Sequence, residues 1–213
     1  MRNFAIVLLG LMCPFSLWAG CAPEKMVKVV FRDGTPGVDA ESVAAKPKTL
    51  YRYQGRYARL EEPEDPVRKT RRLLIANEPD LWNIDLVSKT GQHHVDKEKP
   101  SQFRSPVFGT PGATEFLKGF EFGCELEFMK AKSVTPETAT IEGKTLDTYR
   151  VSEGDQTIYL AVDTQLQKPV IAALEHGDKQ VNVVKYVAYD TVSNPNLELF
   201  KAPTEVTVKE EKP

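Results

Sequence analysis

Regularly spaced turns separate short alternating segments in the second half of the chain, and this pattern constrains the fold more than any other feature. Turn residues recur at 142–143, 153–155 and 176–178. Between them, apolar side chains such as Ile158 and Leu160 occupy every second position, which places them on one face of an extended strand. Short strands at this spacing predict an antiparallel meander, sandwich or barrel.

The first half of the chain adds strands of the same kind. Residues 26–32 alternate between apolar and charged side chains, and the segment 81–88 places three apolar residues on one face: Trp82, Ile84 and Leu86. We therefore expect one β domain over residues 26–203. The charged residues 204–213 are expected to form a flexible tail that frays.

One helix is predicted in the middle of the chain, at residues 113–130. Phe116, Phe120 and Cys124 recur at four-residue spacing and form an apolar face. Gly119 and Gly123 weaken such a helix by up to about 1 kcal/mol each relative to Ala, so it needs a surface to lie against. The predicted fold class is therefore mainly β (α+β), with a curved antiparallel sheet covered by a helix.

The interface between this helix and the sheet is a candidate ligand cavity. We expect Phe116 and Phe120 to face the sheet residues Trp82, Ile84 and Leu86. A curved sheet under a weakly stable helix can hold an apolar ligand there. The same aromatic side chains are also typical of an ordinary packed core, so both interpretations stay open.

The first twenty residues have the organisation of an export signal. Arg2 provides a positive charge, and residues 5–19 contain none. About fifteen residues are too few to span a bilayer, which needs about twenty, but they suit the apolar region of a signal peptide. Residues 1–20 are therefore predicted to be removed, and residues 21–25 to form an N-terminal tether.

The sequence Trp18-Ala19-Gly20-Cys21 resembles a bacterial lipobox. The resemblance implies that the chain is cut before Cys21 and that this cysteine is the lipid anchor. The lipobox pattern has an aliphatic residue where this chain has Trp18. Ordinary cleavage after Ala19 or Ala22 is the alternative, and a disulfide between Cys21 and Cys124 requires that Cys21 is not lipidated.

Composition and motifs argue against several functional classes. The chain has 28 basic and 30 acidic side chains, a balance that argues against a nucleic-acid partner. It contains no glycine-rich phosphate loop, no Gly-x-Ser-x-Gly and no Cys-x-x-Cys. His93 and His94 are neighbours on an expected strand and so point to opposite faces. We predict no catalytic residues, no metal site and no cofactor, and therefore no enzyme.

Several segments resemble the LolA-like superfamily, which sorts outer-membrane lipoproteins. A strand that ends in Asp, a strand that begins with Pro, a hairpin, a long strand and a closing Leu-Phe-x-x-Pro turn follow one another. The segments are residues 57–61, 81–86, 158–163, 167–170, 177–178, 184–186 and 196–203. They are spread over most of residues 26–203. The resemblance implies an unclosed antiparallel β-barrel whose concave, apolar face is covered by helices and binds acyl chains or apolar peptides.

These features together predict a non-catalytic protein of the bacterial cell envelope. The first hypothesis is that it binds a lipid or a lipoprotein acyl chain in the concave sheet. The alternative is a partner-binding or sensor module that presents the same surface, or its loop 96–112, to another envelope protein. The expected location is the periplasm, with anchoring to the outer membrane through a lipid on Cys21.

Overall fold

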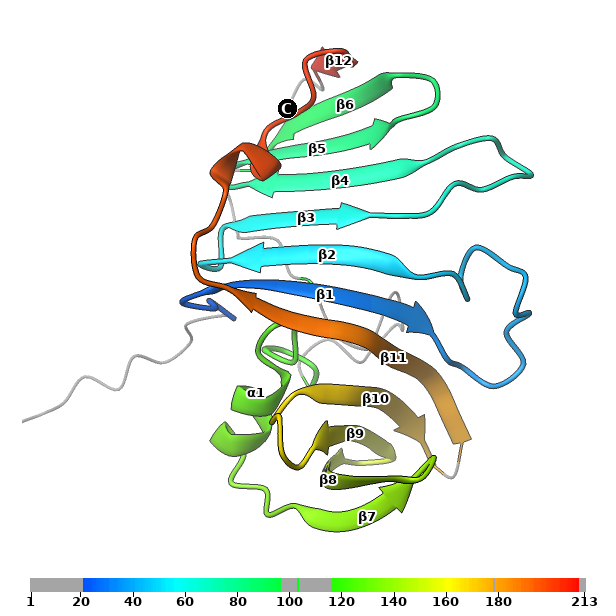
Figure 1. Ribbon diagram of the computed structural model, residues 1–213, viewed down its shortest axis with the longest axis vertical. Coiled ribbons are helices and arrows are strands. Elements are labelled where there is room, and N and C mark those ends of the chain that lie inside the picture. The colour runs from blue at the N-terminus through cyan, green and yellow to red at the C-terminus, as the bar shows by residue number, and fades with distance from the viewer. Residues whose placement is uncertain (1–20, 97–102, 104–115, 178, 211–213) are drawn as a thin grey trace, which may run out of the picture.

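The computed structural model describes residues 21–96, 103, 116–177 and 179–210 (Figure 1). The predicted signal peptide and nearly all of the predicted loop 96–112 lie outside the described residues. The described chain contains twelve strands, one α-helix and one 3-10 helix. The strands are β1 (Met26–Asp33), β2 (Lys48–Tyr53), β3 (Tyr57–Glu61), β4 (Arg72–Asn77), β5 (Asp80–Asp85), β6 (Thr90–Val95), β7 (Glu137–Ile141), β8 (Lys144–Glu153), β9 (Gln156–Asp163), β10 (Pro169–His176), β11 (Lys179–Val192) and β12 (Thr207–Glu210).

All twelve strands form one sheet, in the order β12-β6-β5-β4-β3-β2-β1-β11-β10-β9-β8-β7. Neighbouring strands are antiparallel, except that β12 runs parallel to β6. The sheet curves strongly and does not close, and α1 (Glu125–Ala131) lies beside its β8–β11 part (Figure 1). The predicted fold class, a mainly β curved sheet with a covering helix, is confirmed.

The strands form where the sequence alternates. In β1, Val27, Val29 and Phe31 are all buried on one face. The cross-strand register continues that face through directly opposite residues, from Val29 to Leu50, Leu60 and Leu74. We call this side the helix face, because the residues that precede and form α1 pack against it. The opposite side is called the reverse face.

The helix is much shorter than the sequence predicts. The prediction covered residues 113–130, whereas α1 begins at Glu125 and ends at Ala131, and residues 113–115 lie outside the described residues. The reason is backbone conformation: Gly119 and Gly123 have φ angles of +86° and +95°, which a right-handed helix excludes. Residues 116–131, called the cover segment below, therefore form turns followed by two helical turns.

The reverse face of the first six strands has a cover of its own. Phe200, in the 3-10 helix η1 (Leu197–Phe200), is fully buried there beside Leu73, Ile75 and Ile84. Asn196 begins η1, because its side chain accepts a hydrogen bond from the backbone N–H of Glu198. The closing turn predicted from the sequence thus covers part of the reverse face of the sheet.

The predicted flexible tail is partly ordered. Thr207–Glu210 forms β12, and the Thr207 N–H donates to the carbonyl of Lys89 at 2.9 Å. The prediction that the whole of 204–213 frays is therefore wrong, because backbone hydrogen bonds to the edge strand β6 need no apolar side chains. Among the described residues, no helix is long and apolar enough to cross a membrane.

Candidate functional site

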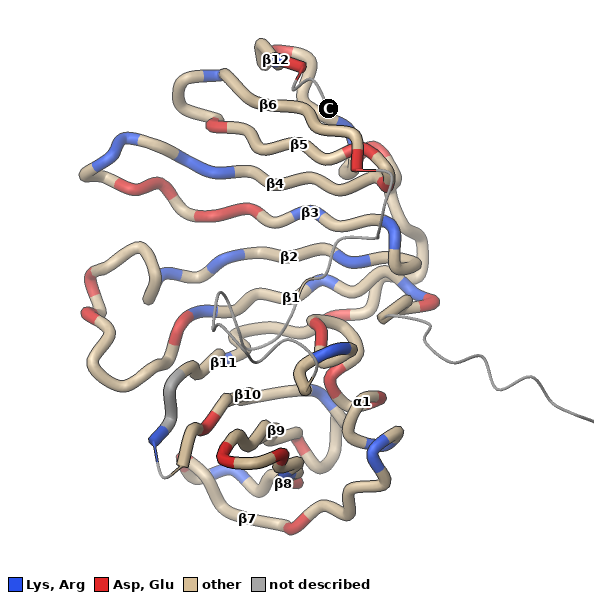
Figure 2. Tube along the Cα trace, turned by 180° about the vertical axis from the view of Figure 1, so that it is seen from behind, with Lys and Arg blue, Asp and Glu red and all other residues tan. Residues whose placement is uncertain are grey.

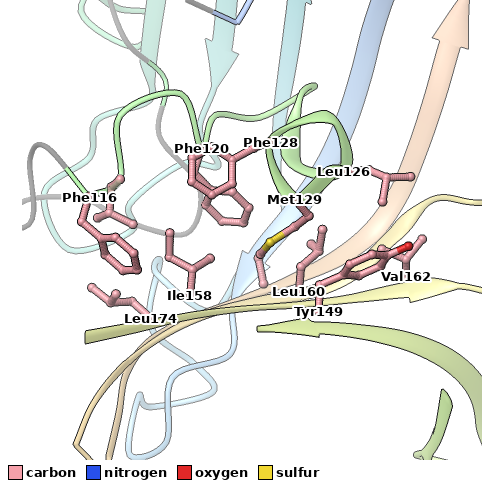
Figure 3. Close-up of a cluster of buried hydrophobic side chains, with 12 residues drawn as sticks. Phe116, Phe120, Leu126, Phe128, Met129, Tyr149, Ile158, Leu160, Val162 and Leu174 are labelled. Atoms are coloured by element: carbon pink, nitrogen blue, oxygen red, sulfur yellow. The ribbon is translucent and has the colours of Figure 1, made fainter. Parts of the chain in front are cut away.

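The helix face divides into a covered half and an open half. Over β8, β9 and β10, the cover segment packs its apolar side chains onto the sheet (Figure 3). Leu117, Phe120 and Met129 are fully buried there. Over β4, β5 and β6, Leu74 and Leu81 remain only half-buried. The open half is therefore the candidate binding surface.

A groove of about 330 Å³ lies over the open half. Its volume is at the small end of the range of about 300–1,000 Å³ for ligand pockets. The groove is lined by Arg72, Leu74, Ile75, Ala76, Leu81, Trp82, Asn83, Gln92, His94 and Phe103. Leu74, Ala76 and Leu81 provide an apolar floor, since the register places them on the helix face.

Polar groups stand at the margin of this floor. Arg72 is exposed at the beginning of β4, and its Nε donates to the Asn83 side-chain oxygen at 3.2 Å. Figure 2 shows further basic residues in the chain that enters β4. The groove therefore combines an apolar floor with one cationic side chain, Arg72, which suits an amphiphilic ligand with an anionic group.

Phe103 is tied to the cover segment. Its backbone N–H donates to a Glu121 carboxylate oxygen at 3.0 Å, and its carbonyl accepts from the Phe122 N–H at 2.9 Å. The Arg52 guanidinium lies 4.9 Å from the centre of the Phe103 ring. The wall of the groove is thus continuous, through Glu121 and Phe122, with the covered half.

A buried ion pair connects the cover segment to β2. Arg52 Nη1 lies 3.0 Å from Glu121 Oε2, and both side chains are almost fully buried, at 2% and 4% exposure. Charges in such a position need their partners, because an unpaired buried charge is very costly. Arg52 sits among apolar residues of β2, so the pair fixes the cover segment to the centre of the sheet.

The structure separates the five predicted cavity residues into two clusters. Phe116 and Phe120 lie on the helix face, packed against Ile158, Leu160 and Leu174 (Figure 3). The other predicted residues, Trp82, Ile84 and Leu86, lie on the reverse face with Phe200. The predicted arrangement, with Phe116 and Phe120 facing the other three across one cavity, is therefore not formed. The physical reason is that strand register turns Trp82 and Ile84 away from the helix, and of the five only Trp82 borders the groove.

Trp82 takes part in a polar arrangement on the reverse face. Its ring stacks on His93 at 4.9 Å between ring centres. His93 Nε2 lies 2.8 Å from an Asp80 oxygen, and Nδ1 lies 2.6 Å from a Glu210 oxygen. Partial burial pushes the pKa of His93 down, but the two carboxylates outweigh it and the net pKa is raised. His93 thus links β5, β6 and β12.

The cover segment contains a second buried carboxyl group. Glu125, the first residue of α1, is completely buried and accepts hydrogen bonds from Tyr186 at 2.7 Å, Tyr189 at 3.3 Å and the Gly123 N–H at 2.9 Å. Burial raises its pKa to about 7, against the opposing effect of these hydrogen bonds. Through its hydrogen bonds with Tyr186 and Tyr189, the carboxyl group attaches the start of α1 to β11.

Cys21, the predicted lipid anchor, is bonded to Cys124 in the structure. The Cα atoms of the two residues lie 5.7 Å apart. A sulfur atom in a disulfide cannot also carry a lipid thioether, so the structure departs from the predicted anchor. Within the described part of the chain, no group of three or more His, Cys, Asp or Glu side chains is placed to hold a metal ion.

Apart from Trp82, the residues that line the groove are not among the predicted cavity residues. The alternation that places Trp82 on one face also places Leu81 and Asn83 on the other. The position of Arg52, in an otherwise apolar and aromatic stretch of its strand, was a signal for a buried ion pair. No local pattern marks Phe103, because its contacts with Arg52 and Glu121 are distant in sequence.

Comparisons with known proteins bear on the fold alone. No family model and no curated protein matches the sequence. An uncharacterized conserved protein from Thermus thermophilus matches with a TM-score of 0.50 and 10% identity, over 88% of this chain and 91% of that chain. The likeness supports the unclosed β architecture.

Two complexes that contain MucB also match, at lower similarity. The Pseudomonas aeruginosa MucA/MucB complex has a TM-score of 0.43 and 10% identity, over 88% of this chain and 59% of that chain. MucB in complex with MucA(peri) has a TM-score of 0.41 and 10% identity, over 88% and 57%. This chain thus spans less than two thirds of the matched chain in each complex.

Proposed function

We propose that this chain is a non-catalytic envelope protein with a LolA-like fold, and that it binds the acyl chain of a lipid or lipoprotein in the groove over β4–β6. The observation that carries the proposal is the apolar groove on the open half of the helix face. Export to the envelope is supported by the signal-like residues 1–20.

The chemistry of the groove favours an amphiphile. An acyl chain would lie on Leu74, Ala76 and Leu81 and gain the free energy of apolar burial, about 25 cal/mol per Å². An anionic group at its end would meet Arg72. A protein segment with an apolar side chain and a carboxylate is the alternative occupant, since the groove is open to solvent.

The test is a titration of the delipidated protein with a fluorescent fatty acid. Leu81→Glu places a carboxylate on the groove floor and should weaken binding by at least about tenfold, because a charge there opposes both the apolar tail and the anionic head. Leu166→Glu is the matched control. Leu166 is 66% exposed, in the turn before β10, and its variant should bind like the wild type.

The second measurement is organic extraction of freshly purified protein followed by mass spectrometry. A co-purifying amphiphile that Leu81→Glu loses and Leu166→Glu keeps would support the acyl-chain proposal. A wild type that carries no amphiphile and does not bind the probe would overturn it in favour of the partner-binding alternative.

A further inference from the structure

The N-terminal residues of the described chain are built into the fold. Cys21 is only 8% exposed, and its carbonyl oxygen accepts a hydrogen bond from Arg52 Nη2 at 3.3 Å. Two residues further on, the carbonyl of Pro23 accepts from the Gln54 N–H at 3.0 Å. A tether that carries a protein away from a membrane needs none of these contacts.

The β2–β3 turn is shaped around this segment. Gly55 has a φ angle of +61°, and a Cβ atom there would lie 3.2 Å from the Cys21 carbonyl oxygen. A side chain at position 55 would therefore be strained and would crowd Cys21. On the other side, Gly123 lies close enough to Pro23 that an added Cβ would be 3.3 Å from that ring.

The Cys21–Cys124 disulfide joins the N-terminal residues to the cover segment. Cys124 directly precedes α1, so the disulfide links residue 21 to the start of the helix, 103 residues away. The Arg52 that holds the Cys21 carbonyl also forms the buried ion pair with Glu121. One cluster thus fixes both the N-terminal segment and the cover segment to β2.

We propose that Cys21 is a structural disulfide cysteine and not a lipidation site, and that the mature chain is released from its leader by cleavage after Ala19. The two fates exclude each other, because a thioether and a disulfide would use the same sulfur. Cys21 Sγ is buried, 3.8 Å from the carbonyl oxygen of Phe122. A Cys21 that carried a diacylglyceryl group would have to move out of this position.

The proposal also decides between the two ordinary cleavage positions. Cleavage after Ala22 would remove Cys21, leave Cys124 without a partner and delete the carbonyl that Arg52 binds. Cleavage after Ala19 keeps all of these contacts. Disulfide formation removes two protons and two electrons from the two thiols, and an envelope thiol oxidase accepts them by reducing its own disulfide to a dithiol.

The test uses the full chain, expressed with its own leader in a Gram-negative host and grown with a labelled fatty acid. The intact mass should equal residues 20–213 less two hydrogen atoms, and the protein should carry no fatty-acid label. Alkylation in denaturant should modify no cysteine before reduction and two cysteines after it. These readouts do not depend on a variant that folds.

Cys124→Ser provides the matched comparison. The proposal predicts that this variant is cut at the same position, remains unlabelled and has one Cys21 thiol that reacts without reduction. A labelled wild type with acylated Cys21 would overturn the proposal in favour of the lipoprotein. A wild type that begins at residue 23 would overturn it in favour of cleavage after Ala22. Two free thiols in an otherwise correct wild-type mass would overturn the disulfide.

Discussion

The two halves of the helix face differ although they belong to one sheet. Over β8–β10, the cover segment buries Phe120, Leu160 and Leu174 almost completely. Over β4–β6, the same face carries the groove. The cover segment packs onto β8–β10, and α1 within it has only seven residues, about 10 Å of helix. A helix of this size covers only a few of twelve strands.

The two sides of the open half also differ, since the described residues cover its reverse face and leave the groove on its helix face. Its reverse face is sealed by Phe200 and the aromatic residues around it, so the sheet is held in place from behind. Packing on the reverse face thus holds β4–β6 in position, while the groove on their helix face is open to solvent. We therefore expect substitutions in the covered half to change stability, and substitutions in the open half to change binding.

The largest expected difference is between Phe120→Ala and Leu81→Ala. Phe120 is fully buried, with its ring centre 5.2 Å from that of Phe128, so its loss should cost about 3–5 kcal/mol of unfolding free energy. Leu81 is only half-buried, and its loss should cost less than about 2 kcal/mol, below the core range. Urea denaturation of both variants measures this, and equal losses would contradict the division into two halves.

Removal of the disulfide should weaken the covered half by a somewhat smaller amount. Replacement of Cys21 and Cys124 by Ser opens a link of sequence separation 103, which should cost about 2–5 kcal/mol. The wild type before and after reduction provides the comparison in chemical denaturation. If reduction left the denaturation midpoint unchanged, the disulfide between Cys21 and Cys124 would contribute nothing to the stability of the covered half.

Glu125 should make the stability of the covered half depend on pH. Its pKa is about 7 in the folded protein, above the ordinary value of 4.5. Below about pH 4.5 it is protonated in both states, and its contribution to stability is fully present. As the pH rises towards 7, the unfolded chain releases the proton first, so the unfolding free energy falls.

The variant that isolates this effect is Glu125→Gln, which keeps a neutral side chain of the same shape. It should lack the loss of stability between about pH 4.5 and 7, with a flatter profile than the wild type in denaturation at several pH values. If the unfolding free energies of the two proteins changed in parallel with pH, Glu125 would have an ordinary pKa and would not make the covered half depend on pH.

The smallest expected effect concerns the edge of the open half. The raised pKa of His93 means that its ion pairs with Asp80 and Glu210 stabilise the protein below the ordinary pKa of 6.5, and that this is lost as the pH rises through the folded value. Glu210 is 73% exposed, so the contribution should stay below about 1 kcal/mol.

Hydrogen exchange of the β12 amides measures this edge directly. After correction for intrinsic rates, protection in β12 should be higher at about pH 6 than at about pH 8, on either side of the ordinary His pKa. Glu210→Gln should reduce the difference, whereas the β9 amides should behave the same in both proteins. A β12 whose protection does not respond to pH would show that backbone pairing alone holds it.

The sequence predicted the strands better than their relative positions. Alternation in residues 26–32 and 158–162 identified β1 and β9, because a period of two is a local property of a half-buried strand. Gly119 and Gly123 predict a weak helix. The structure adds that both glycines have positive φ angles and that the helix has only seven residues.

The same distinction between local pattern and tertiary contacts applies to the candidate site. Side-chain periodicity and turn residues act locally, so the sequence alone predicts a sheet with apolar faces and a helical segment, although the predicted helix, 113–130, is much longer than α1. That Trp82 and Phe120 lie on opposite faces of the sheet, and that Cys21 meets Cys124, is visible only in the folded chain. Strand order and register determine those relations, and they depend on the packing of segments up to 103 residues apart.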